Sequence, residues 1–434
     1  MKIIHTSDWH LGQSFINQSR KAEHEAFLAW LLAQIETQQV DALIVAGDIF
    51  DTTTPPSYAR EMYHQFIQSV YKLNCTLILL GGNHDSVAML NESLPLLAAL
   101  NTHLIPNTLA HSVDQVICVP ASRSGANNDV EIGAIVCAIP FIRQRDLVVS
   151  QAGEDQQTKQ TRFQTAITEH YNEVYAAAVA KRDQLGINVP IIATGHLTAV
   201  GATTSDSERL IYVGSLENYP KEAFPPADYI ALGHIHRPQV VSNAQHIRYS
   251  GSPIALSFDE LGADKQVLLV DFAQPAEGKH SNQQPAFTPT ITPLLIPQHQ
   301  PMQVIIGNLA SIEAQLKAFT DTSDIAHPDV LPVWLFITVQ QEDYMADLAN
   351  IIADYAEGKH VTILKITRAR GQKDQVLQQQ QQEKLDQLTP QDVFSKRLEQ
   401  ESITDNQELL NDVQRTFGKI LSDVQHDTPL GEAP

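Results

Sequence analysis

Side chains that commonly bind divalent cations follow short apolar runs at five places in this sequence. Each run has the length and the β-branched content of a buried parallel strand. The residues that follow the runs are Asp8 and His10, Asp48, Asn83 and His84, His196, and His234 and His236. Two carboxylates, one amide and several imidazoles at strand ends are typical of a pair of divalent cations that cleaves phosphoesters.

The candidate ligands differ in what each offers a cation. Asp48 has two oxygens and can bridge two cations, which lie about 3.5–4 Å apart in such sites and would otherwise repel each other. A single His is more often a core or surface residue, so the prediction depends on DxH, GDxxD, GNHD, GH and GHIH occurring together in this order. The predicted ligands are Asp8, His10, Asp48, Asn83, His196, His234 and His236.

Two residues directly after Asn83 are candidates for catalysis rather than for metal binding. His84 could donate a proton to the leaving oxygen or stabilise the charged phosphorane. We expect Asp85 to fix the orientation of His84. Asp85 could also be the N-cap of the helix that follows, and the two roles are compatible.

A layered α/β core is needed to bring the five strand ends together. Residues 1–272 alternate strand-like and helical stretches, among them an amphipathic helix expected over 20–39. Open α/β sheets bind ligands at the carboxyl ends of their strands. We therefore expect the five ends to converge on one crevice.

The remainder of the chain divides into three parts by composition. Residues 273–300 are rich in Pro, Gln and Thr, which predicts an extended linker with little packing of its own. Residues 301–370 follow a βαβαβ pattern and predict a small α+β domain that shapes access or contacts substrate. Residues 371–434 predict a polar tether and two short amphipathic helices. These helices could fold back on their own domain, but we favour docking on another subunit.

Charge and hydropathy restrict the partners of this protein. The formal net charge is −21, so a DNA substrate would need a local basic surface or a partner that supplies one. No apolar run approaches the roughly 20 residues that span a bilayer. The first residues lead straight into a strand and a ligand motif, without the pattern of a signal peptide. We expect a soluble cytoplasmic protein that does not contact membranes.

Several long motifs together identify a resemblance to a known family. They are HTSDWHLGQ, VAGDIFDTTTPPSYAR, GGNHDSVAMLNES, ATGHLTAVGA, YIALGHIHRPQ and YSGSPIALSFDE. These motifs resemble those of the SbcD family of bacterial nuclease subunits, within the calcineurin-like metallophosphoesterases. The resemblance runs essentially from end to end. It implies a layered metallophosphoesterase sheet core, a small capping domain on the DNA-binding side and carboxy-terminal helices that dock on SbcC, an ATPase with a coiled coil. It also implies a homodimer within a heterotetramer.

The resemblance implies roles for individual residues as well. It assigns two manganese ions per chain, with magnesium or another divalent cation as alternatives, and it makes His84 the catalytic histidine. Asp51 stands where archaeal and eukaryotic relatives usually have a histidine. We therefore expect Asp51 to contact a metal ligand rather than the metal or the substrate. The ligand sets would be Asp8, His10, Asp48 and His236 for the first ion, and Asp48, Asn83, His196 and His234 for the second.

Three arginines near these motifs are candidate phosphate contacts. Arg237 is next to the ligand pair of GHIH, and Arg143 and Arg145 belong to FIRQRD. Each could equally be an ordinary solvated arginine.

The activity implied by the resemblance is manganese-dependent cleavage of DNA during recombination, replication and repair. It comprises 3′→5′ exonuclease action on double-stranded ends and endonuclease action on single strands and hairpins, controlled by ATP hydrolysis in the partner. One alternative is a phosphatase or cyclic-nucleotide phosphodiesterase with the same centre. Another is a non-catalytic scaffold for DNA ends. The predicted small domain and docking helices favour the nuclease, and the full set of ligands argues against the scaffold.

Overall fold

The computed structural model describes most of the chain up to residue 369. The described residues are 1–121, 131–148, 155–205, 207–208, 219–272, 287–325, 327, 330–340 and 347–369. The two helices that the sequence predicts within 371–434 lie outside these residues. That part of the prediction is therefore not addressed by the fold.

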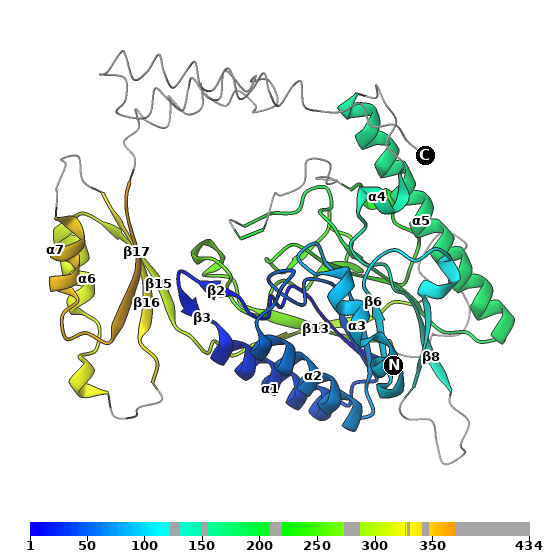
Figure 1. The fold of residues 1–434 in the computed structure, drawn as a ribbon, viewed down its shortest axis with the longest axis horizontal. Coiled ribbons are helices and arrows are strands. Elements are labelled where there is room, and N and C mark those ends of the chain that lie inside the picture. Colours follow the sequence, from blue (N-terminus) through cyan, green and yellow to red (C-terminus); the bar gives the residue numbers. More distant parts are fainter. Residues whose placement is uncertain are drawn as a thin grey trace, which may run out of the picture. The chain divides into compact units, whose positions relative to one another are not determined.

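Two six-stranded sheets, rather than one, contain the five apolar runs (Figure 1). The strand order is β14-β13-β1-β4-β5-β6 in the first sheet and β11-β12-β10-β9-β8-β7 in the second. In the first sheet β1, β4, β5 and β6 run parallel, and in the second β12, β10, β9 and β8 do so. The central strands that lead to candidate ligands are therefore parallel, as the sequence predicts.

The strands of the two sheets have the following bounds. The first sheet contains β1 (Lys2–Thr6), β4 (Ala42–Val45), β5 (Thr76–Leu80), β6 (Thr102–Ile105), β13 (Gln266–Asp271) and β14 (Thr290–Leu295). The second contains β7 (Val116–Pro120), β8 (Ile132–Cys137), β9 (Ile191–His196), β10 (Tyr229–Gly233), β11 (Gln239–Val240) and β12 (Ile247–Tyr249). A short hairpin, β2 (Ser14–Phe15) and β3 (Gln18–Ser19), follows β1.

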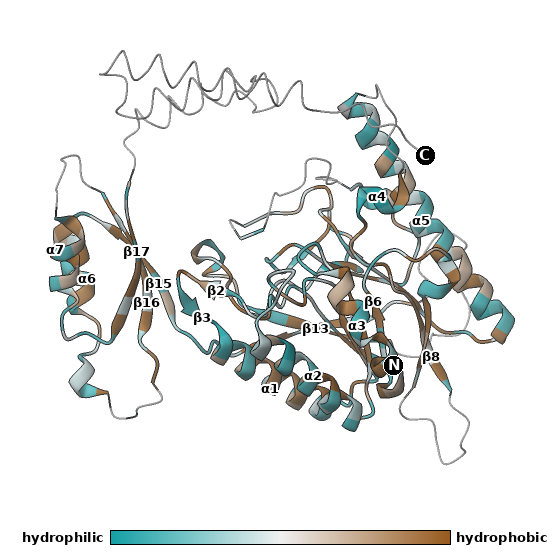
Figure 2. Cartoon of the chain, viewed as in Figure 1, coloured by the Kyte–Doolittle hydropathy of each residue, from teal (hydrophilic) through white to brown (hydrophobic). Residues whose placement is uncertain are grey.

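The two sheets face each other, and helices cover their outer faces. In β4, Ala42 and Ile44 pack into the core between the sheets, whereas Leu43 and Val45 pack toward the helices. Both faces of the strand are buried, so the run is continuously apolar instead of alternating. In Figure 2, strand β13 is mostly brown (hydrophobic), whereas the helices carry both teal and brown residues. The predicted layered α/β core is confirmed.

Among the described residues, five α-helices accompany the two sheets. Residues of α1 and α2 pack on the first sheet, and residues of α5 pack on the second. In α1 the buried positions include Phe27, Leu28, Leu31 and Ile35, which have the spacing of one helical face. The helix predicted over 20–39 is thereby confirmed. The bounds are α1 (Lys21–Gln38), α2 (Ser57–Lys72), α3 (Val87–Leu97), α4 (Gln144–Leu147) and α5 (Gln156–Leu185).

Part of the predicted linker over 273–300 is a strand of the first sheet. β14 pairs antiparallel with β13 along all six of its residues. The expectation of an unpacked connector was wrong for this stretch. β14 lies at the edge of the sheet, where a proline such as Pro293 is tolerated because one side of the strand makes no ladder hydrogen bonds. A proline-rich composition therefore did not exclude a strand.

The small βαβαβ unit predicted after residue 300 is present. Its three-stranded sheet has the order β15-β16-β17, and its own core includes Ile305, Ile312, Leu335 and Ile352. Trp334 of β16 packs with Phe15 and Phe258. The bounds are β15 (Met302–Gly307), α6 (Leu309–Lys317), β16 (Val333–Val339), α7 (Leu348–Tyr355) and β17 (Val361–Arg368).

Membrane-spanning helices were not expected from the sequence. Within the described ranges, no helix combines the length and the apolar character that crossing a bilayer requires.

Candidate metal centre

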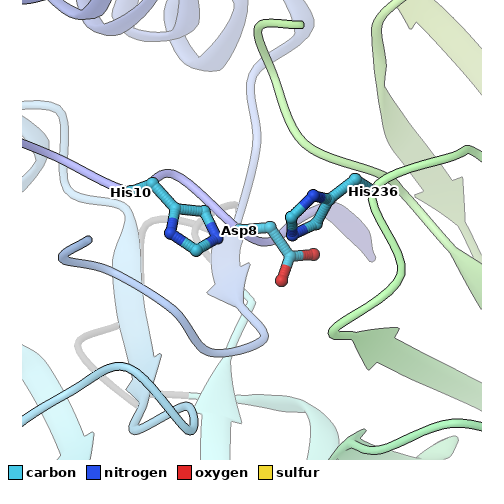
Figure 3. A group of neighbouring side chains, drawn as sticks. All are labelled: Asp8, His10 and His236. Atoms are coloured by element: carbon cyan, nitrogen blue, oxygen red, sulfur yellow. The ribbon is translucent and has the colours of Figure 1, made fainter. Parts of the chain in front are cut away.

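Strands of both sheets end at one place, where the candidate ligands meet. Strands β1, β4 and β5 come from the first sheet, and β9 and β10 come from the second. Their ligand atoms form three groups, and within each group all of these atoms lie within 4.8 Å of one another. Figure 3 shows the first group. The groups are Asp8 with His10 and His236, His10 with Asp48 and His84, and Asp48 with His196 and His234.

Glycines between the strands and the ligands permit this close approach. A Cβ atom on Gly47 would lie 2.2 Å from Nδ1 of His196, and one on Gly82 would lie 2.1 Å from Oδ1 of Asp48. Gly47 also has a φ of +92°, a conformation that residues with side chains rarely adopt. A side chain at either glycine would therefore displace a ligand.

The backbone at Asp8, His10 and Asp48 has positive φ angles of 54°, 48° and 51°. This left-handed conformation costs on the order of 1–3 kcal/mol for a residue other than glycine, although Asp and His tolerate it better than most. The backbone N–H of Asp8 donates to the oxygen of Gly47, and that of His10 donates to the oxygen of Asp48, both at 3.0 Å. These bonds between the loops after β1 and β4 maintain the conformation that directs the ligands inward.

The carboxylate of Asp48 occupies the middle of the cluster. Its Oδ1 accepts a hydrogen bond from the backbone N–H of His84 at 2.9 Å. Its Oδ2 lies 3.3 Å from Nε2 of His196, 3.6 Å from Nε2 of His10 and 4.0 Å from Nε2 of His84. One oxygen is thus held by the backbone, and the other faces three imidazoles.

Neighbouring polar groups also orient the side chains of Asn83 and Asp8. Oδ1 of Asn83 lies 2.9 Å from Nε2 of His196 and 3.0 Å from Nδ1 of His234. Oδ1 of Asp8 accepts from the backbone N–H of His234 at 2.9 Å, and the hydroxyl of Ser7 donates to its Oδ2 at 2.5 Å. The structure therefore brings all seven predicted ligands into one cluster.

His10 provides a test of whether the cluster fits a cation. Its ring is buried, and among the described residues its Nε2, 3.6 Å from Oδ2 of Asp48, has no hydrogen-bond partner. Buried polar atoms are almost always paired. An unpaired buried nitrogen that faces the carboxylate of Asp48 therefore fits a cation bound between the two groups. Oδ1 of Asp51 lies 3.3 Å from the other nitrogen, Nδ1, which is where a carboxylate holds the ring of a metal-binding histidine. The donor set fits divalent cations.

Burial and the shared carboxylate determine the charges of the metal-free cluster. Burial alone would lower the pKa of His196, but the charge of Asp48 raises that pKa to about 9. Burial lowers the pKa of His234 to about 3. Burial alone would raise the pKa of Asp48, but neighbouring imidazoles hold it well below its usual range. At neutral pH the metal-free cluster thus contains an ionised carboxylate and a protonated His196.

Cation binding should therefore release protons. A cation can bind His196 only when the imidazole is neutral, and its pKa of about 9 means that the proton is present at pH 7. We expect the manganese affinity to rise as the pH increases from 7 toward 9. Titration calorimetry in two buffers of different ionisation enthalpy measures the number of protons released on cation binding. The His196→Gln variant should release fewer protons than the wild type. Binding heats that are independent of the buffer would contradict this expectation.

His84 has one ring nitrogen tied to the backbone and one directed at the cluster. Its Nδ1 lies 2.8 Å from the backbone oxygen of Asp51. A carbonyl only accepts, so Nδ1 donates, and Nε2 is the nitrogen that faces Oδ2 of Asp48. Because His84 also belongs to one of the three groups, its distances are compatible with a catalytic role and with a ligand role.

The carboxylate of Asp85 is bound by backbone groups of two loops. Its carboxylate accepts from the backbone N–H groups of Ile49, Phe50 and Gly82 at 3.1, 2.9 and 2.8 Å. It thereby joins the loops after β4 and β5, and burial, reinforced by the charge of Asp48, raises its pKa to about 6. The cap of α3 is also provided by another residue, because the hydroxyl of Ser86 accepts from the N–H of Met89 at 3.4 Å.

The three candidate arginines differ in their surroundings. Arg143 donates from Nη2 to the backbone oxygens of Gly82 and Asp85 at 3.3 and 3.1 Å, and within the described part of the chain its buried Nη1 has no hydrogen-bond partner. Arg145 is 79% exposed and lies 3.9 Å from Asp146. Arg237 donates to the backbone oxygen of Asp259 at 2.6 Å. Of the three, Arg143 is anchored on the loop that carries Asn83 and His84.

Four polar residues around His236 were missed by the sequence analysis. The hydroxyl of Ser207 lies 2.6 Å from Nδ1 of His236, and Oε1 of Glu260 lies 3.3 Å from the same nitrogen. Glu208 accepts from the backbone N–H of His236 at 2.7 Å, and Lys265 donates to Glu260. The acidic residues of SFDE were visible in the sequence, but nothing in the spacing marks one of them as buried beside a ligand.

Comparisons with known proteins find two family models and several relatives that match this chain. A family model described as calcineurin-like phosphoesterase matches residues 1–238, which include all seven predicted ligands. A second model, described as Type 5 capsule protein repressor C-terminal domain, matches residues 298–402. The chain is 46% identical over 408 residues to the D subunit of nuclease SbcCD from Escherichia coli (strain K12), covering 94% of this chain and 95% of that protein.

Two further relatives with the same name cover less of the chain. The protein from Rhodobacter capsulatus is 37% identical over 289 residues, with 64% of this chain and 68% of the relative covered. The protein from Bacillus subtilis (strain 168) is 33% identical over 281 residues, with 64% of this chain and 67% of the relative covered. The likeness thus extends to relatives from three different organisms.

Proposed function

We infer that this chain, which belongs to the SbcD family of calcineurin-like phosphoesterases, cleaves DNA phosphodiesters with two divalent cations, manganese in the cell. The observation that carries this proposal is the position of Asp48. Its Oδ2 lies 3.3 Å from Nε2 of His196 and 3.6 Å from Nε2 of His10, as expected of a carboxylate shared by two cations. Asp8, His10, Asp48 and His236 would hold the first cation, and Asp48, Asn83, His196 and His234 the second.

The residues of the chain perform distinct tasks in this proposal. When bound, the cations supply Lewis acidity that activates water and neutralises the charge growing on the phosphate. His84 presents Nε2 to the substrate and donates a proton to the leaving oxygen, while the backbone oxygen of Asp51 fixes its ring. The carboxylate of Asp51 lies beside Nδ1 of His10 and orients the ring of this histidine. Asp85 keeps the loops of Asp48 and His84 together through backbone hydrogen bonds.

Comparing a DNA hairpin with a small aryl phosphate diester tests the choice of substrate. The nuclease proposal predicts manganese-dependent cleavage of the hairpin by the full chain together with its SbcC-type partner and ATP. Turnover of the small diester without cleavage of the hairpin would favour a phosphodiesterase instead. The same assay with an end-labelled duplex and a single strand tests the proposed 3′→5′ exonuclease and endonuclease modes.

Arg143 is proposed to contact the phosphate of the DNA. Its Nη1 is a buried donor without a hydrogen-bond partner among the described residues, and hydrogen bonds to the loop after β5 hold the guanidinium in place. Arg143→Gln should raise the KM for DNA about 10- to 100-fold, since a charged hydrogen bond contributes about 1.5–3 kcal/mol. Arg145→Gln is the matched control, and it should leave the KM unchanged because Arg145 is largely exposed. Equal effects of both changes would contradict the assignment.

The partner is proposed to be an SbcC-type ATPase that binds residues 371–434 of this chain. This region lies outside the described residues, so the support comes from its amphipathic pattern and from the name of the relatives, which identifies them as one subunit of the SbcCD nuclease. A homodimer within a heterotetramer that acts in the cytoplasm completes the proposal. The net charge of −21 is consistent with a partner that supplies much of the grip on DNA.

Deleting residues 371–434 should abolish co-purification with the SbcC-type partner and leave the metal centre intact. The expected result is a protein that binds manganese as the full chain does but no longer retains the partner on an affinity column. Retention of the partner by the shortened protein would show that other surfaces carry the interaction.

A further inference from the structure

His236 is held by a hydroxyl and a carboxylate that belong to no part of the proposed metal centre. Nδ1 of His236 lies 2.6 Å from Oγ of Ser207 and 3.3 Å from Oε1 of Glu260. Ser207 in turn donates to the same carboxylate oxygen of Glu260. Because Nδ1 is engaged on this side of the ring, Nε2 is the nitrogen available to a cation beside Asp8 and His10 (Figure 3).

Glu260 is itself firmly fixed. Its side chain is buried, and Oε2 accepts from Nζ of Lys265. The same oxygen accepts from the backbone N–H of Leu256 and from the hydroxyl of Ser252, both at 3.2 Å. A buried ion pair adds little stability compared with apolar residues of the same size. Stability alone is therefore a weak reason for a carboxylate at this position.

The ligand histidines of the two proposed cations, His10 and His236 for the first and His196 for the second, differ in the group that lies beside Nδ1, the ring nitrogen that does not face the cation. Both imidazoles of the first cation face a carboxylate, because Asp51 lies 3.3 Å from Nδ1 of His10 and Glu260 lies 3.3 Å from Nδ1 of His236. By contrast, Nδ1 of His196, at the second cation, donates to the backbone oxygen of Ala46 at 2.8 Å. A carboxylate makes an imidazole a more basic ligand than a carbonyl does.

We propose that Glu260 is a positioning residue for the first cation. Directly and through Ser207, it keeps the proton of His236 on Nδ1, turns Nε2 toward the cation and increases the donor strength of the ring. Glu208 has a different task, because it accepts from the backbone N–H of His236 rather than from the ring. The inference rests on the proposed two-cation centre and adds to it a residue outside both ligand sets.

Manganese binding to the full chain tests this inference without any measurement of activity. Glu260→Gln keeps the shape of the side chain and removes its charge. It should therefore lower the affinity for the first cation 10- to 100-fold, the usual effect of losing a residue that orients a metal ligand. Binding of the second cation should not change. His236→Ala and His196→Gln identify which step of the titration belongs to which site. Glu313→Gln, on an exposed ion pair of α6, is the matched control and should bind both ions normally.

A double-mutant cycle separates positioning from a general loss of stability. If Glu260 acts through His236, then Glu260→Gln should not weaken the first cation further in a His236→Ala background. Additive losses would overturn the inference. Glu260→Gln with Lys265→Met removes both charges of the buried pair and should restore the melting temperature without restoring the affinity. Recovery of the affinity along with the melting temperature would show that Glu260 is merely structural.

The wild-type titration keeps this inference distinguishable from the proposed function. A wild-type chain that fails to bind two manganese ions would contradict the proposed centre. A wild-type chain that binds two ions, with a Glu260→Gln variant that binds them equally well, would contradict the inference alone.

Discussion

Asp48→Asn should lower the rate of manganese-dependent DNA cleavage about 10³-fold or more. The change preserves the shape of the side chain and an acceptor for the backbone N–H of His84, but it removes the charge from the oxygen that faces three imidazoles. Losing one electrostatic group in an active site typically lowers kcat about 10²–10³-fold. Asp48 would serve both cations, so we expect a loss at or beyond the upper end of this range.

Electrostatic repulsion explains why this one substitution should affect both cations. Two unit charges 4 Å apart repel by about 4 kcal/mol at an effective dielectric constant of 20, and two divalent cations repel by roughly four times as much. The ionised carboxylate between them offsets part of this repulsion. We therefore expect elemental analysis of Asp48→Asn to find fewer than two manganese ions per chain, even though six of the seven ligands remain.

A second buried aspartate provides the control for this experiment. Asp228 is buried and accepts backbone hydrogen bonds from Ile191 and Phe287 at 2.8 and 2.7 Å, but it is not part of the cluster. Asp228→Asn should lower the melting temperature while retaining metal and cleavage by the folded fraction. Full metal content and substantial cleavage in Asp48→Asn would refute the shared carboxylate.

The convergence of the ligands was predictable because it depends on local sequence patterns. An apolar run, a glycine and a polar residue are contiguous in the chain, and parallel strands deliver their carboxyl ends to the same edge of a sheet. The close approach at Gly47 and Gly82 follows from the same pattern. The amphipathic spacing of α1 and the βαβαβ pattern of the small unit are likewise local.

The division of the strands between two sheets could not be predicted in the same way. A strand buried on both faces is continuously apolar whether its neighbour is a helix layer or a second sheet. Residues of β4 contact both kinds of layer, and their side chains do not differ in kind. The edge strand β14 shows that a proline-rich composition does not argue against pairing at the edge of a sheet, because edges tolerate proline.

Contacts between distant loops were also beyond the reach of the sequence. Ser207 and Glu260 are 29 and 24 residues from His236 in the chain, and no periodicity links them. Asp85 shows the same limit at short range. Its position next to His84 in the chain gives no sign of the backbone N–H groups of two loops from which its carboxylate accepts, because only the folded arrangement brings these groups within reach.

His84→Ala should leave two manganese ions bound and lower the rate of cleavage about 10²- to 10⁴-fold, the usual contribution of a positioned acid or base. Its Nδ1 is engaged with the backbone oxygen of Asp51, so only Nε2 is available for chemistry. At 4.0 Å from Oδ2 of Asp48, Nε2 is farther from this oxygen than the corresponding nitrogens of His196 and His10. This order of distances favours a role at the substrate.

Metal content and leaving-group dependence together distinguish the two roles of His84. If His84 protonates the leaving oxygen, a diester with a strongly acidic leaving group needs less help, and the variant should lose less activity on it than on DNA. His64→Ala, at an exposed position of α2, should change neither quantity. If His84→Ala instead loses one manganese ion and slows both substrates equally, His84 is a ligand. The group formed by His10, Asp48 and His84 would then be a cation site in its own right.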